Sequence, residues 1–356
     1  MSKTNIYLAA SLPLIAALLI SCASSPTAET DAMRKDARAA IDQGHYSEAI
    51  DILEKARTKD EQKFGQDGAA TSTDYMLLGE ALRNQNQLQK AEEYLEKSVA
   101  ARQKAIQPGL LDLAESLNGL GDTLAEQGQL DEAETILNHA LSVREQQLNA
   151  NSLPVAESKN SLGRVYLQAG EFNEAEKYLK EAMAVFEKQL DKNDKRLADA
   201  RTNLGSVYYA TNRLDQAEPL LKWALQIYQV RDPKSIDTAN ALNNLGELAR
   251  AKNRFAEAES FYKDALAIYK DKNTESSRYA TVINNLAVLY HGEKKFADAE
   301  PLYKQALQMY EKTTGKDSLE LANTLENYAN LERATGRSAE ADQLDKRANK
   351  IIAHKS

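Results

Sequence analysis

The sequence predicts an all-α fold, a solenoid of about eight helix-turn-helix hairpins. Three observations lead to this prediction. A pattern with a period of 41 or 42 residues recurs along most of the 356-residue chain, and each copy has small residues at the same three positions. Apolar residues recur at helical spacing, as Leu242, Leu245 and Ala249 do, and no useful stretch alternates with a period of two. Such a period is typical of solenoids, whose units bury their apolar faces only against their neighbours.

The small residues predict where the two helices of each hairpin cross. The first series falls in the first helix of each copy: Ala37, Gly79, Gly121, Gly163, Gly205, Gly246, Ala287 and Ala329. Twelve residues later every copy has an alanine in its second helix: Ala49, Ala91, Ala133, Ala175, Ala217, Ala258, Ala299 and Ala341. Another small residue follows seven positions further on: Ala56, Ser98, Ala140, Ala182, Ala224, Ala265, Ala306 and Ala348. A glycine inside a helix costs roughly 1 kcal/mol relative to alanine, so its presence in five copies indicates a close approach of the helices.

A turn residue separates the two predicted helices of each copy. The seventh copy has Lys294 there, and the other seven copies have glycine or asparagine: Gly44, Asn86, Gly128, Gly170, Asn212, Asn253 and Gly336. Glycine and asparagine accept the left-handed conformation that closes a helix end. A large apolar residue two positions later is expected to open the second helix: Tyr46, Leu88, Leu130, Phe172, Leu214, Phe255 and Phe296.

The repeated positions resemble those of the tetratricopeptide repeat (TPR). The sixth copy reads Leu245-Gly246, then Ala258, Tyr262 and Ala265. The usual repeat has about 34 residues. The longer period and the Asn-Asn-Leu sequence that ends at Leu245 are similar to the kinesin-light-chain subtype. The resemblance covers about residues 31–352 and implies a right-handed superhelical solenoid of eight TPR hairpins, with residues 353–356 as a tail. It is specific for fold and leaves function open.

The terminal copies differ from the inner ones in polarity. Asp36 replaces a leucine in the first copy, and Glu332 and Asp345 stand at apolar positions in the last copy. Terminal units with a polar outer face keep a solenoid soluble. We therefore expect the two ends to be caps of a complete array.

A short apolar run opens the chain. Lys3 is the only charge before it, and it covers residues 6–20 with Pro13 inside. A helix of this length reaches about 22 Å, less than the ~30 Å core of a bilayer. Residues 1–21 are therefore predicted to be a secretory signal rather than a spanning helix.

The end of this segment, Leu19-Ile20-Ser21-Cys22, resembles the bacterial lipobox, and Cys22 is the only cysteine in the chain. The resemblance implies cleavage before Cys22 and its lipidation, with acyl chains such as palmitate anchoring the protein to a membrane of the bacterial cell envelope. Ala23, rather than aspartate, favours the outer membrane facing the periplasm. Residues 22–30 then contain the lipidated cysteine and a flexible tether. Two alternatives are a buried, inert cysteine in an ordinary signal peptide and a cytosolic TPR regulator with a fortuitous lipobox.

Composition and motifs argue against nucleic-acid binding and catalysis. The formal net charge of −8 gives no net attraction to nucleic acid. No two of the four histidines are spaced to share a metal: His45, His139, His291 and His354. Gly315-Lys316 lacks the rest of a phosphate-binding loop. We expect no enzyme activity, no cofactor and no metal. Trp223 is predicted to belong to the core rather than to a ligand site.

Stacked hairpins curve, and the first helices are expected to line the concave side as a groove. Asparagine is a poor helix former, so its recurrence on these helices needs a reason: Asn118, Asn160, Asn203, Asn243, Asn244, Asn284, Asn285 and Asn327. Charged residues accompany them: Glu80, Asp122, Arg164 and Glu247. In the kinesin-light-chain subtype such asparagines contact bound peptide, which the resemblance implies here. The alternative is that they hydrogen-bond between neighbouring repeats. Acidic residues gather in the N-terminal half, which favours a partner with a basic segment.

These observations predict a non-enzymatic, membrane-anchored TPR lipoprotein. Its groove would bind a protein or peptide partner, so that the protein acts as an adaptor or assembly scaffold in the bacterial cell envelope. One alternative is a structural envelope protein that self-associates. The sequence leaves the partner and the oligomeric state open.

Overall fold

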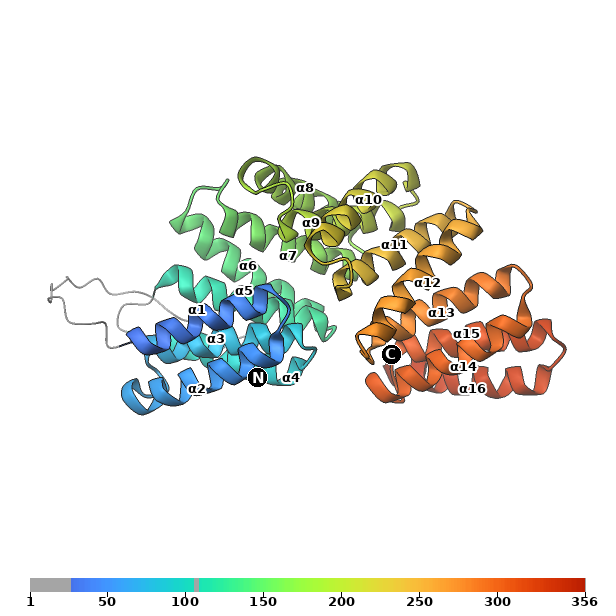
Figure 1. Cartoon of the computed structure of the whole chain (residues 1–356), viewed down its shortest axis with the longest axis horizontal. Coiled ribbons are helices and arrows are strands. Elements are labelled where there is room, and N and C mark those ends of the chain that lie inside the picture. The colour runs from blue at the N-terminus through green and yellow to red at the C-terminus, as the bar shows by residue number, and fades with distance from the viewer. Residues whose placement is uncertain (1–26, 106–108, 356) are drawn as a thin grey trace, which may run out of the picture. The chain divides into compact units, whose positions relative to one another are not determined.

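The computed structural model describes residues 27–105 and 109–355. Over these residues the chain forms sixteen α-helices and no strand, which confirms the predicted all-α fold (Figure 1). The helices belong to two compact units, divided between Gln189 and Leu190.

Unit 1 contains four helical hairpins. Its helices are α1 (Ala28–Asp42), α2 (Tyr46–Phe64), α3 (Ala69–Asn84), α4 (Leu88–Lys104), α5 (Leu110–Glu126), α6 (Leu130–Gln147), α7 (Leu153–Ala169) and α8 (Phe172–Gln189). Unit 2 also contains four hairpins. Its helices are α9 (Lys195–Ala210), α10 (Leu214–Arg231), α11 (Ile236–Ala251), α12 (Phe255–Asp271), α13 (Ser277–Gly292), α14 (Phe296–Thr313), α15 (Leu319–Ala334) and α16 (Ser338–Lys355).

The helix boundaries follow local signals in the sequence. The second helices α2 to α14 each begin at the large apolar residue that the sequence predicts. Three first helices of unit 2 begin with a serine cap, whose hydroxyl accepts a backbone N–H: Ser235, Ser276 and Ser318. Every predicted glycine or asparagine turn residue has a positive φ, and Lys294 has one as well, at 61°. Lysine therefore occupies a backbone conformation that favours glycine or asparagine.

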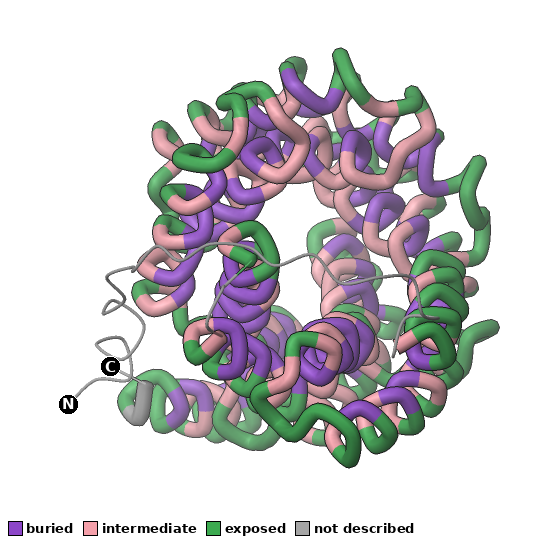
Figure 2. The backbone as a smooth tube through the Cα atoms, turned by 90° about the vertical axis from the view of Figure 1, so that its left-hand side faces the viewer, coloured by how far each residue is buried: buried purple, intermediate pink, exposed green. Residues whose placement is uncertain are grey.

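The small residues lie where the two helices of a hairpin pack together. The eight repeated alanines of the second helices are all completely buried. A Cβ added at Gly163 would lie 2.6 Å from Leu179 Cγ and 3.3 Å from the carbonyl oxygen of Ala175. The first-helix glycine therefore accommodates the large side chain sixteen residues later, beside the backbone of the alanine twelve residues later. In Figure 2 the buried segments lie along the helices, and the exposed segments gather at the turns.

Contacts between hairpins show which helices lie on the inside of each unit. In unit 1, α1 contacts α3, α3 contacts α5, and α5 contacts α7; in unit 2, α9, α11, α13 and α15 contact one another in the same way. Within each unit the described backbones of successive second helices lie farther apart, and contacts between these helices are made by long side chains such as Tyr94, whose hydroxyl donates to Glu54 Oε1 at 2.7 Å. Each unit therefore curves toward its first helices, as the sequence predicts. We call the surface that these first helices form the inner side.

The beginning and end of the described chain differ in three details from the prediction. Helix α1 begins at Ala28, inside the predicted tether, because Thr30 is buried and donates to Asp60 Oδ1 at 3.1 Å. Helix α16 continues to Lys355, so most of the predicted tail is helical. Glu332 does not lie on a polar outer face, since it is only 2% exposed and pairs with Arg337.

The N-terminal signal prediction and Cys22 lie outside the described residues. Within residues 27–105 and 109–355, none of the helices has both the length and the apolar character needed to cross a membrane.

Candidate functional site

The polar residues of the inner side form different networks in the two units. One position of each repeat illustrates this difference, namely the position directly after the small residue of the first helix. We call it the inner charged position: Arg38, Glu80, Asp122, Arg164, Ser206, Glu247, Val288 and Asn330. Its side chains lie on successive first helices, so neighbours in this series come from adjacent repeats.

In unit 1 the inner charged positions pair between adjacent repeats. Arg38 Nη1 lies 2.6 Å from Glu80 Oε2, and Arg164 Nη2 lies 2.7 Å from Asp122 Oδ1. Burial raises the pKa of Asp122, but Arg164 and Arg83 more than offset this effect, so that the pKa is lowered overall. Three predicted groove residues, Glu80, Asp122 and Arg164, therefore hold neighbouring repeats together. This pairing weakens the case from unit 1 for a partner with a basic segment.

Asn118 is also committed to contacts between repeats. Its Oδ1 accepts hydrogen bonds from Ser158 Oγ at 2.8 Å and from Arg144 Nη1 at 3.3 Å. Its Nδ2 donates to Ser161 Oγ at 3.3 Å and to Asp122 Oδ2 at 3.2 Å. These contacts connect α5 with α6 and α7, and they favour the structural interpretation of this asparagine.

In unit 2 two predicted asparagines bind a carboxylate instead of an arginine. Asn285 Nδ2 donates to Glu247 Oε1 at 2.7 Å and to Asn243 Oδ1 at 3.0 Å. Asn243 Nδ2 donates to the same Glu247 oxygen at 3.2 Å. Burial raises the pKa of Glu247, and these two amide donors oppose that shift. Among the described residues, no basic side chain comes within ion-pair distance of Glu247.

The other five predicted asparagines lie half-buried on the first helices. Asn160 and Asn203 each have an interaction partner. Asn284 Oδ1 is buried without a hydrogen-bond partner in the described chain. Asn244 and Asn327 form no side-chain hydrogen bond with any described residue. Their amides are thus available to another molecule.

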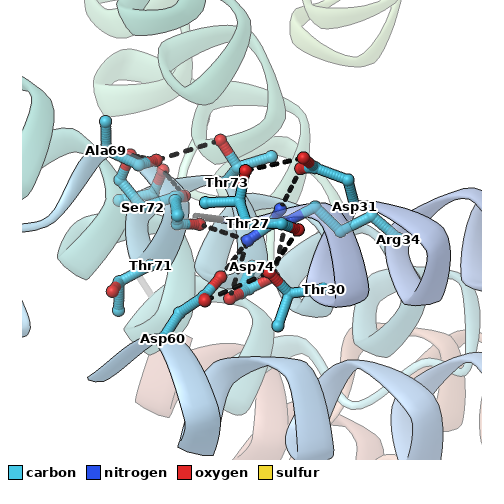
Figure 3. Close-up of polar contacts among 12 residues, drawn as sticks. Thr27, Thr30, Asp31, Arg34, Asp60, Ala69, Thr71, Ser72, Thr73 and Asp74 are labelled. Atoms are coloured by element: carbon cyan, nitrogen blue, oxygen red, sulfur yellow. Dashed lines mark hydrogen bonds and ion pairs between the residues drawn. The ribbon is translucent and has the colours of Figure 1, made fainter. Parts of the chain in front are cut away.

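The structure contains a buried charged cluster that the sequence did not lead us to expect. Arg34 on α1 contacts three carboxylates, those of Asp31, Asp60 and Asp74 (Figure 3). Asp60 and Asp74 are almost completely buried, and they come from α2 and α3. The cluster therefore joins the first hairpin to the second.

The second and third repeats each have a buried arginine at the position that Asp60 occupies in the first repeat, namely Arg102 and Arg144. Arg144 is 5% exposed and donates to the Pro154 carbonyl at 2.7 Å and to Ser158 Oγ at 2.8 Å, and Arg102 likewise contacts Ser116 in the next repeat. The fourth to seventh repeats have aromatic residues at this position, namely Phe186, Tyr228, Tyr269 and Tyr310, and the eighth has Ile352. In the sequence, these buried charges could have been recognised as charged residues at a position that is aromatic in four other repeats.

Trp223, His45 and His291 lie in three different environments. Trp223 is half-buried, with the Arg201 guanidinium carbon 3.4 Å from the ring centroid. His45 is exposed, whereas His291 lies beside Phe296 and Tyr303. Over residues 27–105 and 109–355, no three His, Cys, Asp or Glu side chains are placed to hold one metal ion. What the inner side offers is amides, carboxylates and guanidinium groups, which suit the binding of polar chains.

Comparison with known proteins identifies the repeat. The family model of the tetratricopeptide repeat matches residues 33–104, 112–188, 155–229, 196–271 and 278–351. A comparison with curated proteins found no match.

Several solved structures are similar to this chain. The Rap protein complexed with Competence and Sporulation Factor is 15% identical over 92% of this chain and 98% of that one, with a TM-score of 0.64. BtubC (BKLC) from P. vanneervenii is 23% identical over 63% of this chain and 91% of that one, with a TM-score of 0.52. The apo form of the quorum sensor NprR from B. thuringiensis is 14% identical over 91% of this chain and 99% of that one, with a TM-score of 0.56. These identities show a shared fold, and since the family model matches most of the sequence, the chain belongs to the tetratricopeptide repeat family.

Proposed function

We propose that this chain is a non-enzymatic TPR lipoprotein of the bacterial cell envelope that binds protein or peptide partners on its inner side. In this proposal acyl chains on Cys22 anchor it to the outer membrane, facing the periplasm, and it acts as an adaptor or assembly scaffold. The anchoring part of the proposal rests on the resemblance of Leu19-Ile20-Ser21-Cys22 to a lipobox.

The single observation that best supports partner binding is the state of the inner side in unit 2. Asn244 and Asn327 have no hydrogen-bond partner in the described chain, and Glu247 has no ion pair there. Asparagine is a poor helix former, so an asparagine without a structural contact is better explained by an external ligand. A main-chain amide of a peptide would satisfy both the donor and the acceptor of such a side chain.

The fold also agrees with this function. TPR arrays present an extended surface, and one similar structure, the Rap protein, was solved in complex with Competence and Sporulation Factor. That complex is an example of this fold holding a partner, and it supports the proposal by analogy of fold.

A comparative pull-down tests partner binding. The full chain in detergent is used as bait in an envelope extract, beside an Asn244→Ala, Asn327→Ala variant. The matched control is Asn138→Ala, Asn173→Ala, which removes two exposed asparagines from second helices of unit 1. We expect the first variant alone to lose partners that the wild type retains. Equal capture by all three proteins would contradict binding on the inner side.

A separate experiment tests the anchor. Replacing Cys22 by serine removes the thiol that would be lipidated, so the protein should move from the membrane fraction to the soluble fraction. Incorporation of labelled palmitate into the wild type but not into the variant would identify the modification. An unchanged membrane fraction would contradict the lipoprotein proposal and would leave the binding proposal standing.

A further inference from the structure

We propose that Glu247 and Arg250, on the inner side of unit 2, together bind an amide group of the partner. The Glu247 carboxylate would accept the amide N–H, and the Arg250 guanidinium would donate to its carbonyl oxygen. This inference rests on the proposed function and specifies where on the inner side the partner binds and through which chemical group.

The register of the inner charged positions singles out Glu247. The acidic members of this series in unit 1, Glu80 and Asp122, each pair with an arginine of an adjacent repeat. The neighbours of Glu247 in the same series are Ser206 and Val288, and neither can supply a cation. Glu247 is therefore the acidic residue of this series that has no arginine at the same position of an adjacent repeat.

The two carboxylate oxygens of Glu247 are used unequally. Glu247 Oε1 accepts N–H groups from both Asn243 and Asn285, whereas Oε2 accepts no hydrogen bond from any described residue. The two amides hold the carboxylate in one orientation without neutralising it. A half-buried carboxylate with one free oxygen is a charge-assisted acceptor for an external N–H group.

Arg250 follows Glu247 on α11 by about one helical turn. Within the described chain it forms no ion pair, with Glu247 or with any other carboxylate. Its charge nevertheless acts on Glu247, Tyr209 and Tyr262, because it opposes the rise in pKa that burial causes at all three. Because residues three positions apart on a helix are neighbours on its surface, Arg250 lies beside Glu247 on α11.

Tyr262 lies in the same region, and Arg250 opposes the rise in its pKa that burial causes, both through its charge and as a hydrogen-bond donor. The Tyr262 side chain is completely buried against Gly246, and its hydroxyl has no hydrogen-bond partner at ordinary geometry in the described chain. Buried hydroxyl groups are almost always paired, so a hydroxyl without a partner at ordinary geometry is unusual.

An amide matches this arrangement better than an ion does. A carboxylate and a guanidinium that lie near each other without pairing present a negative and a positive group side by side, so a ligand of either sign would be repelled by one of them. An amide carries a donor and an acceptor on adjacent atoms and no net charge. The amide can come from the main chain of a peptide or from an asparagine or glutamine side chain.

The probe for this site is a library of random twelve-residue peptides displayed on phage and selected against the full chain in detergent. Affinities of the selected peptides are then measured for the wild type, Glu247→Gln, Arg250→Met and the double variant. The control is Glu259→Gln, which makes the same charge change on α12 of the same hairpin, where Glu259 pairs with Lys263. Equal helicity and thermal midpoints of all variants exclude unfolding as the cause.

We expect each single variant to weaken binding by roughly tenfold, since hydrogen bonds to charged groups are among the stronger ones, while Glu259→Gln stays within about twofold. If one amide bridges both residues, the double variant should lose less than the product of the single losses. Methylating peptide nitrogens one at a time, and replacing each asparagine or glutamine by leucine, distinguishes a main-chain amide from a side-chain amide.

Three results would overturn the inference. If peptides bind Glu247→Gln and Arg250→Met as tightly as the wild type but lose affinity for the Asn244→Ala, Asn327→Ala variant, the inner side binds partners elsewhere and the proposed function survives. If affinity depends on a lysine or arginine of the peptide and not on any amide, Glu247 binds a cation. If the library yields no binding peptide, the proposed peptide binding fails together with this inference.

Discussion

Arg34 Nε donates to Asp74 Oδ1 at 2.8 Å, and this buried contact joins the first repeat to the second. The same guanidinium contacts Asp31 and Asp60, so one cation faces three carboxylates. Burial raises the pKa of Asp74 to about 7, and the nearby Asp60 adds to the rise, while Arg34 opposes it. The contact between these two repeats is therefore sensitive to pH.

Replacing Asp74 by asparagine should remove part of the pH dependence of stability. The Asp74 carboxyl group keeps its proton up to about pH 7 in the folded protein, whereas in the unfolded chain it ionises near 3.8. The folded state thus binds more protons between these values, and the free energy of unfolding falls as pH rises toward 7. The loss should be roughly 2–4 kcal/mol, at about 1.4 kcal/mol per pKa unit.

The measurement is urea-induced unfolding of the wild type and Asp74→Asn between pH 5 and pH 8. This range avoids the acid region where other carboxylates, whose pKa is lowered in the folded state, lose their contribution. Asp67→Asn, at an exposed site, serves as a control and should keep the wild-type slope. Parallel curves for the wild type and Asp74→Asn would contradict the role of this carboxyl group.

Two glycine-to-alanine changes should have opposite effects. Alanine at Gly163 would place its Cβ 2.6 Å from Leu179 Cγ, so the hairpin must open and stability should fall by about 1–3 kcal/mol. A Cβ added at Gly292, at the end of α13, would meet nothing within 4 Å, and alanine there should stabilise the helix by up to about 1 kcal/mol. Thermal unfolding of both variants checks the pair. A stabilised Gly163→Ala would mean that the helices do not cross there.

The hairpins could be predicted from the sequence because each is specified by local signals. A glycine, an alanine twelve residues later and a turn residue between them recur often enough for their common role to be recognised. The second helices accordingly begin where large apolar residues such as Phe255 predict. Local chemistry within one repeat was sufficient for this part of the fold.

The roles of the inner polar residues could not be predicted in the same way. Asn244 and Asn285 occupy the same position of adjacent repeats, yet Asn285 donates to Asn243 and Glu247 of the preceding repeat, whereas Asn244 forms no side-chain hydrogen bond in the described chain. The difference depends on which side chains the adjacent repeats place opposite them. Such pairings form between residues about forty positions apart, and a single sequence does not reveal them.

Lys294 offers a direct way to stabilise the seventh hairpin. Its φ of 61° lies in the left-handed region, where a lysine costs roughly 1–2 kcal/mol more than glycine and asparagine is better tolerated. Lys294→Asn should therefore raise the free energy of unfolding by about 0.5–1 kcal/mol. The reverse change in the preceding hairpin, Asn253→Lys at φ 58°, should lower it by a similar amount. Chemical denaturation of both variants tests the expectation, which fails if the two changes shift stability in the same direction.

Two asparagine-to-alanine changes should separate structural from available amides. Asn118→Ala removes the acceptor for Arg144 and Ser158, both nearly buried, and should cost about 1–3 kcal/mol because those donors lose a partner. Asn327→Ala removes a side chain without a hydrogen bond in the described chain, so stability should change by less than about 0.5 kcal/mol. Urea unfolding of both variants at one pH gives the comparison. If Asn327→Ala were as damaging as Asn118→Ala, its amide would have a structural role, and the inner side of unit 2 would lose one of the groups on which partner binding depends.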